Sequence, residues 1–128
     1  MTGNSAVVDT NIFIDLMKGD AGIAKELESF TAVYVSPIVL AELYFGAYRS
    51  ASPENHLSKI AAAIQKTRLL TIGAKTSEIF VTIKMAVFAK GKPIPENDIW
   101  IAASALQYNL PLYTNDNHFL EIEKLQMI

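Results

Sequence analysis

Short apolar runs rich in β-branched residues alternate in this chain with longer segments whose apolar residues recur every three to four positions. The first pattern is typical of strands buried on both faces, and the second is typical of helices that pack one face against a sheet. Strands are predicted at residues 5–8, 32–35, 69–72 and 110–113, with a candidate fifth strand at 125–128. Strands that alternate with helices predict an α/β fold whose mainly parallel sheet is covered on both faces.

Helix signals fill the segments between these runs. Ser36 and Pro37 form a helix start, because serine caps the first turn and proline at the first helical position leaves no extra N–H unpaired. The helix that follows, to about Tyr48, is apolar almost all round, so we expect it to be deeply buried; Glu42 is its only charge. Further helices are predicted at residues 12–17, 21–30, 53–68, 74–90 and 96–108, ended by Asn109, with a helical turn at 118–121.

Composition limits the class of protein. The chain has 128 residues, 51% of them hydrophobic and 19% charged, and contains no internal repeat or linker, so we expect one globular domain over residues 1–128. It has no cysteine, so a bound metal must use oxygen or imidazole ligands. It has neither a leader-like N-terminus nor an apolar run long enough to span a membrane, which predicts a soluble, cytoplasmic protein.

Four acids stand at positions that suggest a site. Asp9 and Asp116 directly follow predicted strands, and ligands in α/β sheets bind at the carboxyl ends of the strands. Asp98 stands at a helix start after a proline-rich loop. Taken singly, these aspartates have ordinary roles as helix caps or turn residues. Glu42 has no basic residue at helical spacing, so its partner must come from elsewhere in the fold.

Convergence of these acids would require a cation. Two carboxylates about 4 Å apart repel by roughly 4 kcal/mol at an effective dielectric near 20, and a divalent ion removes that repulsion. Carboxylate ligands favour Mg²⁺ or Mn²⁺, and hydrolysis of a phosphodiester is the reaction that such a site serves best. The formal net charge is −2, from eleven basic and thirteen acidic residues; without the four acids it becomes +2, which permits an RNA substrate.

The order of these motifs resembles the PIN domain, and specifically the VapC-type toxins of prokaryotic toxin–antitoxin pairs. The likeness is carried by Val7-Val-Asp-Thr-Asn, by Ser36-Pro37 with Glu42, by Pro95-Glu-Asn-Asp98 before Ile101-Ala-Ala, and by Thr114-Asn-Asp116 with Phe119. It covers nearly the whole chain. The resemblance implies a three-layer α/β/α sandwich, a Mg²⁺- or Mn²⁺-dependent endoribonuclease, a homodimer, and inhibition by a cognate antitoxin protein.

The resemblance also assigns roles. Asp9, Asp98 and Asp116 match the metal-holding acids, Glu42 matches an acid that binds metal directly or through water, and Asn11 and Thr114 match polar positions that support the site. Apart from the resemblance, Lys90, Lys92 and Arg49 are weaker candidates for phosphate contacts: solvated loop lysines are the favoured interpretation for the first two, and Arg49 can also simply end its helix favourably. His118 is assigned a structural role. Tyr44, Phe45 and Tyr48 are expected in the core or in a dimer interface.

Two other functions remain open at this stage. A phosphatase of the haloacid-dehalogenase type also begins with an aspartate after its first strand, but it requires a second aspartate two positions later, where this chain has Asn11. A catalytically idle PIN-like binding module is expected to have lost one or more of the acids, and none is missing. Transfer, ribosomal and messenger RNA are all open as substrates, because no motif reads RNA sequence.

Overall fold

The computed structural model describes residues 4–128, and it has a parallel sheet between two layers of helices. In chain order the elements are β1 (Ser5–Val8), α1 (Thr10–Met17), α2 (Ala21–Glu28), β2 (Ala32–Val35), α3 (Pro37–Tyr48), α4 (Pro53–Ile64), β3 (Arg68–Leu69), α5 (Ala74–Ala89), α6 (Glu96–Gln107), β4 (Leu112–Tyr113) and the 3₁₀ helix η1 (Asn117–Glu121). The strands are ordered β3-β2-β1-β4, and all three pairings are parallel. The predicted fold class is therefore confirmed.

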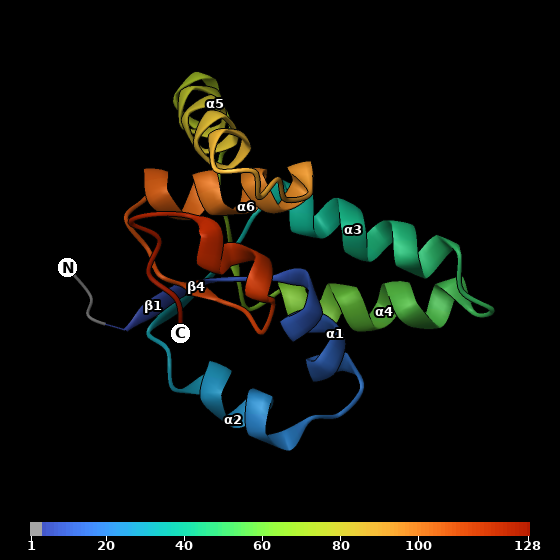
Figure 1. Ribbon diagram of the computed structural model, residues 1–128. Coiled ribbons are helices and arrows are strands. Elements are labelled where there is room, and N and C mark those ends of the chain that lie inside the picture. The colour runs from blue at the N-terminus through green and yellow to red at the C-terminus, as the bar shows by residue number, and fades with distance from the viewer. Residues whose placement is uncertain (1–3) are drawn as a thin grey trace.

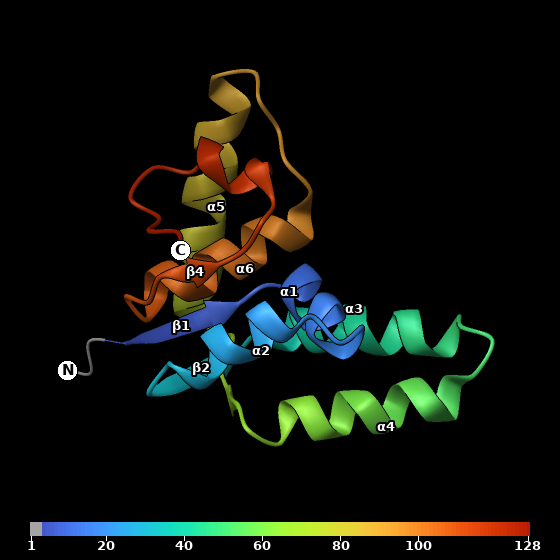
Figure 2. The same ribbon diagram turned by 90° about the horizontal axis from the view of Figure 1, so that it is seen from below.

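The layers are visible in both ribbon views. Helices α5 and α6 lie on one side of the sheet, and α1, α2 and α4 lie on the other (Figures 1 and 2). Helices α3 and α4 run alongside each other and project beyond the sheet. In the described part of the chain, residues 4–128, no helix is both long and apolar enough to cross a membrane.

The central strands form the core of the molecule. Ala6, Val7 and Val8 of β1 are completely buried because helices cover both faces of the sheet. Strand β1 pairs with β2 on one side and with β4 on the other, so the carboxyl end of β1 lies between two neighbouring strands. This arrangement brings the residues that follow β1 and β4 to the same edge of the sheet.

The predicted helix boundaries are confirmed where a cap defines them. The hydroxyl oxygen of Ser36 accepts a hydrogen bond from the backbone N–H of Ile38 at 3.0 Å, and Pro37 occupies the first turn of α3. Asn109 follows α6 with a φ of 54°, the left-handed conformation expected of a helix terminator. Local sequence therefore sets these two boundaries without help from tertiary contacts.

The expectation that the helix ending at Tyr48 is deeply buried is wrong. Only Val39, Leu43 and Ala47 of α3 are buried, while Phe45 is 63% exposed and Tyr48 is 68% exposed. The physical reason is that α3 extends past the sheet and packs on neighbouring helices along one side only. An apolar sequence shows that a surface can be buried, but the fold decides whether a partner is present to bury it.

Three predicted strands are shorter than expected. Pairing in β3 ends at Leu69, although the prediction ran from 69 to 72, and pairing in β4 begins only after Pro111, which has no N–H to donate. The candidate fifth strand at 125–128 is reduced to one isolated parallel bridge between Leu112 and Met127. The sheet is thus regular only around β1 and β2.

Candidate metal centre

Asp9 is the most buried of the four predicted acids, with 4% of its surface exposed. It follows β1 and caps α1: its Oδ1 accepts a hydrogen bond from the backbone N–H of Thr10 at 2.8 Å. Its Oδ2 accepts a second hydrogen bond from the hydroxyl of Thr114, also at 2.8 Å. Burial raises the pKa of Asp9 above its usual value despite these two donors, and the charges of Glu42 and Asp116 raise it further.

Thr114 joins two of the acids. Its hydroxyl donates to Asp9, and the same oxygen accepts a hydrogen bond from the backbone N–H of Asp116 at 3.0 Å. Asp116 in turn caps η1, because its Oδ1 accepts from the backbone N–H of His118 at 2.9 Å. The structure therefore places Thr114 in contact with Asp9 and Asp116 at the shared edge of β1 and β4.

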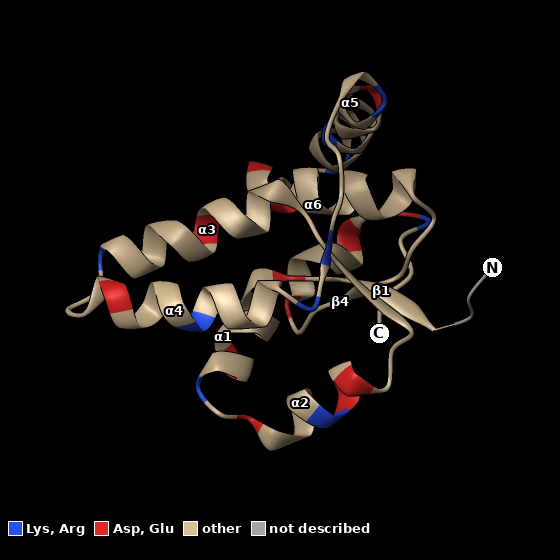
Figure 3. Cartoon of the chain, turned by 180° about the vertical axis from the view of Figure 1, so that it is seen from behind, with Lys and Arg blue, Asp and Glu red and all other residues tan. Residues whose placement is uncertain are grey.

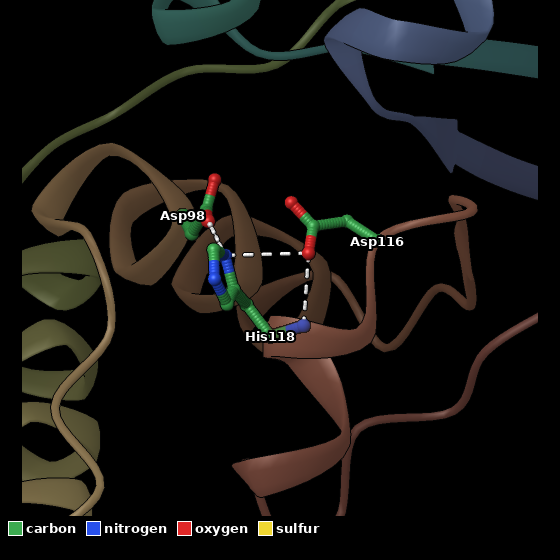
Figure 4. Close-up of side chains that lie close together, drawn as sticks. All are labelled: Asp98, Asp116 and His118. Carbon is green, nitrogen blue, oxygen red and sulfur yellow. Dashed lines mark hydrogen bonds and ion pairs between the residues drawn. The ribbon is translucent and has the colours of Figure 1, made fainter.

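Asp98, Asp116 and His118 form a close cluster at the start of α6 (Figure 4). The His118 Nδ1 lies 3.1 Å from Asp98 Oδ2 and 3.2 Å from Asp116 Oδ1. One carboxylate oxygen of each aspartate and one ring nitrogen of the histidine all lie within 4.8 Å of one another. Burial raises the pKa of Asp98, the hydrogen bond with His118 lowers it, and the charges of Asp116 and Asp9 raise it. A single cation between these atoms would be within reach of all three side chains.

Glu42 receives its partners from two other helices, as the sequence required. Thr10 at the start of α1 donates its hydroxyl to Glu42 Oε1 at 2.5 Å. Asn97 at the start of α6 donates its side-chain amide to Glu42 Oε2 at 3.3 Å. Each oxygen of the half-buried Glu42 is therefore oriented by a neutral donor, and no Lys or Arg of the described chain neutralises its charge. Both oxygens of Glu42 are thus held in fixed positions beside the other acids.

The charges of the four predicted acids influence one another. Asp9 interacts with the charges of Glu42 and Asp116, and Asp98 interacts with those of Asp116 and Asp9. Asn11 is the exception among the predicted residues: it is exposed, and within residues 4–128 its side chain makes no hydrogen bond. The support expected from Asn11 therefore stays a prediction, whereas Thr114 makes the contacts that a supporting residue needs.

Sequence analysis missed three residues that the structure brings to the acids. Thr10 and Asn97 orient Glu42, and His118, to which it assigned a structural role, lies against Asp98 and Asp116. Thr10 and Asn97 had a usable signal, since each directly neighbours a predicted acid at a helix start. His118 had no such signal, because its contact with Asp98 spans 20 positions between different elements.

Lys and Arg side chains do not gather at the acids. Lys and Arg are spread over several elements in Figure 3. Lys90 donates to the backbone oxygen of Glu121 and pairs with its carboxylate at 3.2 Å, so it is occupied away from the acids. Arg49 lies over the ring of Phe45, 5.3 Å from its centroid, and Lys92 is exposed in the loop before α6. None of these three residues therefore supplies positive charge that would attract a phosphate to the acids.

The donor set fits a divalent ion that prefers oxygen ligands. It consists of carboxylates with one imidazole, and burial raises the pKa of two of the carboxylates, Asp9 and Asp98, above the usual range. Mg²⁺ and Mn²⁺ bind such oxygen-rich sites, and Mn²⁺ also tolerates imidazole. Cation binding would reverse the pKa shifts of Asp9 and Asp98, because a nearby positive charge stabilises the carboxylate.

Comparisons with known proteins point to one family. The sequence profile of the PIN domain matches residues 6–125. Ribonuclease VapC2 of Haemophilus influenzae is 34% identical over 112 residues, which cover 86% of this chain and 85% of that protein. Ribonuclease VapC of Rickettsia bellii is 30% identical over 127 residues, covering 95% and 93%.

Solved structures agree with this result. VapBC2 from Rickettsia felis, bound to a DNA fragment from its promoter, has a chain similar to this one with a TM-score of 0.92 and 27% identity, over 97% of each chain. VapBC-1 from nontypeable Haemophilus influenzae has a TM-score of 0.88 and 29% identity, over 97% of this chain and 96% of that one.

Proposed function

We propose that this chain, which belongs to the PIN domain family and within it to the VapC ribonucleases, cleaves RNA at a divalent-metal centre built from Asp9, Glu42, Asp98 and Asp116. The observation that carries the proposal is the cluster at the edge of the sheet. Asp98 and Asp116 have carboxylate oxygens within 4.8 Å of each other, and Asp9 is joined to Asp116 through Thr114. The enzyme is a hydrolase that acts on phosphodiester bonds.

The four acids have distinct tasks in this proposal. Asp9, Asp98 and Asp116 hold the cation, which we propose to be Mg²⁺ or Mn²⁺. Glu42 lies on the side of α1 and α6, where Thr10 and Asn97 fix both of its oxygens. Glu42 adds a fourth carboxylate to the centre, and both of its oxygens are held in place by these two donors.

A divalent ion bound to such acids polarises a phosphodiester oxygen and lowers the pKa of bound water. The chain itself supplies orientation: Thr114 fixes one oxygen of Asp9, and the backbone N–H of His118 fixes one oxygen of Asp116. Without positive charge the acids would repel the phosphate of the substrate, because no Lys or Arg in residues 4–128 pairs with any of them. RNA binding and metal binding should therefore depend on each other.

Neither rival function gains support from the site. The position where a phosphatase of the haloacid-dehalogenase type needs its second aspartate is Asn11, which is exposed and points to no partner among the described residues. An idle binding module would have no need for a cluster of four acids, in which burial and repulsion raise the pKa of Asp9 and Asp98 and so destabilise the fold. Both alternatives remain outcomes of the assay described below.

We propose a cognate antitoxin as the protein partner. Support comes from the similar structures, which are VapBC complexes, and from a groove of about 630 Å³ between α1, α2 and α4. Its lining is largely apolar and includes Leu16, Met17, Leu27 and Ala63, together with basic residues of α4 and the segment after it: Lys59, Lys66 and Arg68. Such a groove suits an apolar helix with acidic residues along its edge.

We further propose that the chain forms a homodimer through α3 and α5. Large apolar side chains are exposed on α3 at Phe45 and Tyr48 and on α5 at Val81, Met85 and Phe88, with Phe88 70% exposed. Exposed apolar residues of this size and number on two helices that both pack against α6 mark a protein–protein interface more often than a free surface. The remaining proposals are that residues 1–128 form a single nuclease domain, supported by the profile match over 6–125, and that the protein acts in the cytoplasm.

The test is cleavage of a labelled RNA that contains single-stranded loops. The wild type should cleave it with Mg²⁺ or Mn²⁺ and should lose activity in EDTA. Asp9→Asn and Asp98→Asn keep the side-chain shape but remove ligand charge, so the rate should fall by about 10²-fold or more. Expression of the wild type without its antitoxin should arrest bacterial growth, and expression of Asp9→Asn should not.

The matched control is Glu54→Gln, which removes one carboxylate charge from an exposed position on α4. It should cleave RNA at the wild-type rate. Cleavage that is unaffected by EDTA, or a folded Asp98→Asn variant with near-wild-type activity, would contradict the proposed centre. Binding of RNA without cleavage would support the idle module, and release of phosphate from a monoester would support the phosphatase.

A further inference from the structure

Tyr113 connects the metal centre to a distant helix. It ends β4, and its backbone oxygen accepts a hydrogen bond from the N–H of Asp9 at 3.0 Å. The next residue, Thr114, holds the carboxylate of Asp9 and the N–H of Asp116. The backbone position of Tyr113 therefore sets the position of three groups at the centre.

The side chain of Tyr113 is fixed on the opposite side, toward α2. Its hydroxyl donates to Glu26 Oε1 at 2.5 Å, and its ring lies 6.0 Å from that of Phe30 at an angle of 55°. Tyr113 is 7% exposed whereas Glu26 is exposed, so this charge-assisted hydrogen bond is shielded from water on the tyrosine side only. Burial raises the pKa of Tyr113 to about 12, with a contribution from Glu26, so the hydroxyl remains a donor at neutral pH.

Helix α2 has few other polar attachments, and its apolar contact with the core comes from the partly buried Ile23 and Leu27. It contains no fully buried residue, and it forms one wall of the apolar groove through Ala24 and Leu27. Between residues 4 and 128, Glu26 is the only side chain within α2 that hydrogen-bonds to another element. An element with little buried surface opens at a lower free energy than the core, so the contact with Tyr113 is important for holding α2 in place.

We propose that Tyr113 and Glu26 are positioning residues of the metal centre, whose hydrogen bond ties α2 to the strand end that holds Asp9 and Asp116. The inference rests on the proposed metal-dependent function. Loss of the bond leaves all four acids in the chain but loosens the backbone between Tyr113 and Asp116. The centre is thereby sensitive to the position of α2, although no residue of α2 is among its ligands.

The experiment measures Mn²⁺ affinity of the full chain, from the free Mn²⁺ signal in electron paramagnetic resonance. Tyr113→Phe and Glu26→Ala should weaken binding about 3- to 10-fold, somewhat less than the loss typical of groups in direct contact with metal ligands. Glu26→Gln should stay within about 2-fold of the wild type, because its amide oxygen still accepts from the tyrosine. Since Glu26→Ala and Glu26→Gln remove the same charge, the difference between them isolates the hydrogen bond.

Tyr108→Phe is the matched control. It also removes a tyrosine hydroxyl that donates a hydrogen bond, in this case to the backbone oxygen of Thr71 at 2.8 Å. Its Mn²⁺ affinity should equal that of the wild type. Equal affinities in Tyr113→Phe and Tyr108→Phe, even with a lower Tm in the former, would overturn the proposal, because a purely structural contact changes stability without changing metal binding.

Amide hydrogen exchange in the metal-free protein provides a second readout. Tyr113→Phe should speed exchange at the N–H of Asp9, which bonds to the backbone of Tyr113, and Tyr108→Phe should not. If the wild type bound no Mn²⁺, the proposed function would fail, but faster exchange at Asp9 would still support positioning. Unchanged exchange at Asp9 would overturn the positioning role whatever the metal result.

Discussion

Removal of one acid should have opposite effects on stability with and without metal. In Asp98→Asn the charge that faces Asp116 disappears, while the amide oxygen can still accept a hydrogen bond from His118. A carboxylate oxygen of Asp98 lies within 4.8 Å of one of Asp116, and two unit charges about 5 Å apart repel by roughly 1 kcal/mol in water and roughly 3 kcal/mol at an effective dielectric of 20. Metal-free Asp98→Asn should therefore be more stable than the wild type by about 1–2 kcal/mol, or about 3–8 °C in Tm.

Saturating metal should reverse this order. At a free Mn²⁺ concentration 100 times the Kd, mass action stabilises the wild type by about 2.7 kcal/mol, whereas a variant with weakened binding gains much less. The assay is thermal unfolding in EDTA and in Mn²⁺, with Glu54→Gln as the control that should shift in parallel with the wild type. If Asp98→Asn gained as much from Mn²⁺ as the wild type, or were less stable in EDTA, the assignment of Asp98 to a metal centre would be refuted.

Three further predictions follow from the geometry of the site and the surface. The folded-state pKa values of Asp9 and Asp98 are raised, so above about pH 4 the metal-free native state binds more protons than the unfolded state. The free energy of unfolding in EDTA should therefore fall as pH rises through these pKa values and then level off. Urea titrations of the double variant Asp9→Asn, Asp98→Asn should show no such fall. Light scattering at tens of micromolar should give twice the 14.1 kDa of one chain, and Phe88→Glu should halve that mass; a wild-type monomer would contradict the dimer. Thr10→Val removes the donor to Glu42 and should lower kcat about 10-fold while changing stability by only about 1 kcal/mol; an unchanged kcat would show that the orientation of Glu42 is unimportant.

Sequence reasoning succeeded where short-range chemistry decides the structure. The cap at Ser36 and the left-handed Asn109 follow from residues close together in the chain, and the parallel sheet follows from the alternation of strand and helix patterns along it. It located Asp9 and Asp116 for the same reason, because carboxyl ends of neighbouring parallel strands must share an edge. The exposure of α3 could not be predicted in this way, since the apolar pattern of a helix carries no information about which of its faces finds a partner.

The donors around Glu42 illustrate the same limit. The sequence established that a partner was needed and that no base at helical spacing could supply it, yet it left the identity of that partner open. Thr10 and Asn97 lie 32 and 55 positions away from Glu42, on helices whose relative placement depends on the whole sheet. Contacts of this range become visible only when the strand order and the crossing of α1, α3 and α6 are known.

Asp9 and Thr114 act in both the fold and the site, and this dual role predicts how substitutions there will behave. Asp9 stabilises α1 as its cap, and at the same time its burial near other acids destabilises the metal-free protein. An asparagine at position 9 keeps a side-chain oxygen for the N–H of Thr10 but removes the repulsion, so it should lose activity without losing stability. Thr114→Val differs, because it removes the donor to Asp9 and the acceptor for Asp116 together, and it should therefore lower both. A comparison of the two variants separates the contribution of charge to catalysis from the contribution of hydrogen bonding to the fold, since both should lose activity but only Thr114→Val should lower the free energy of unfolding.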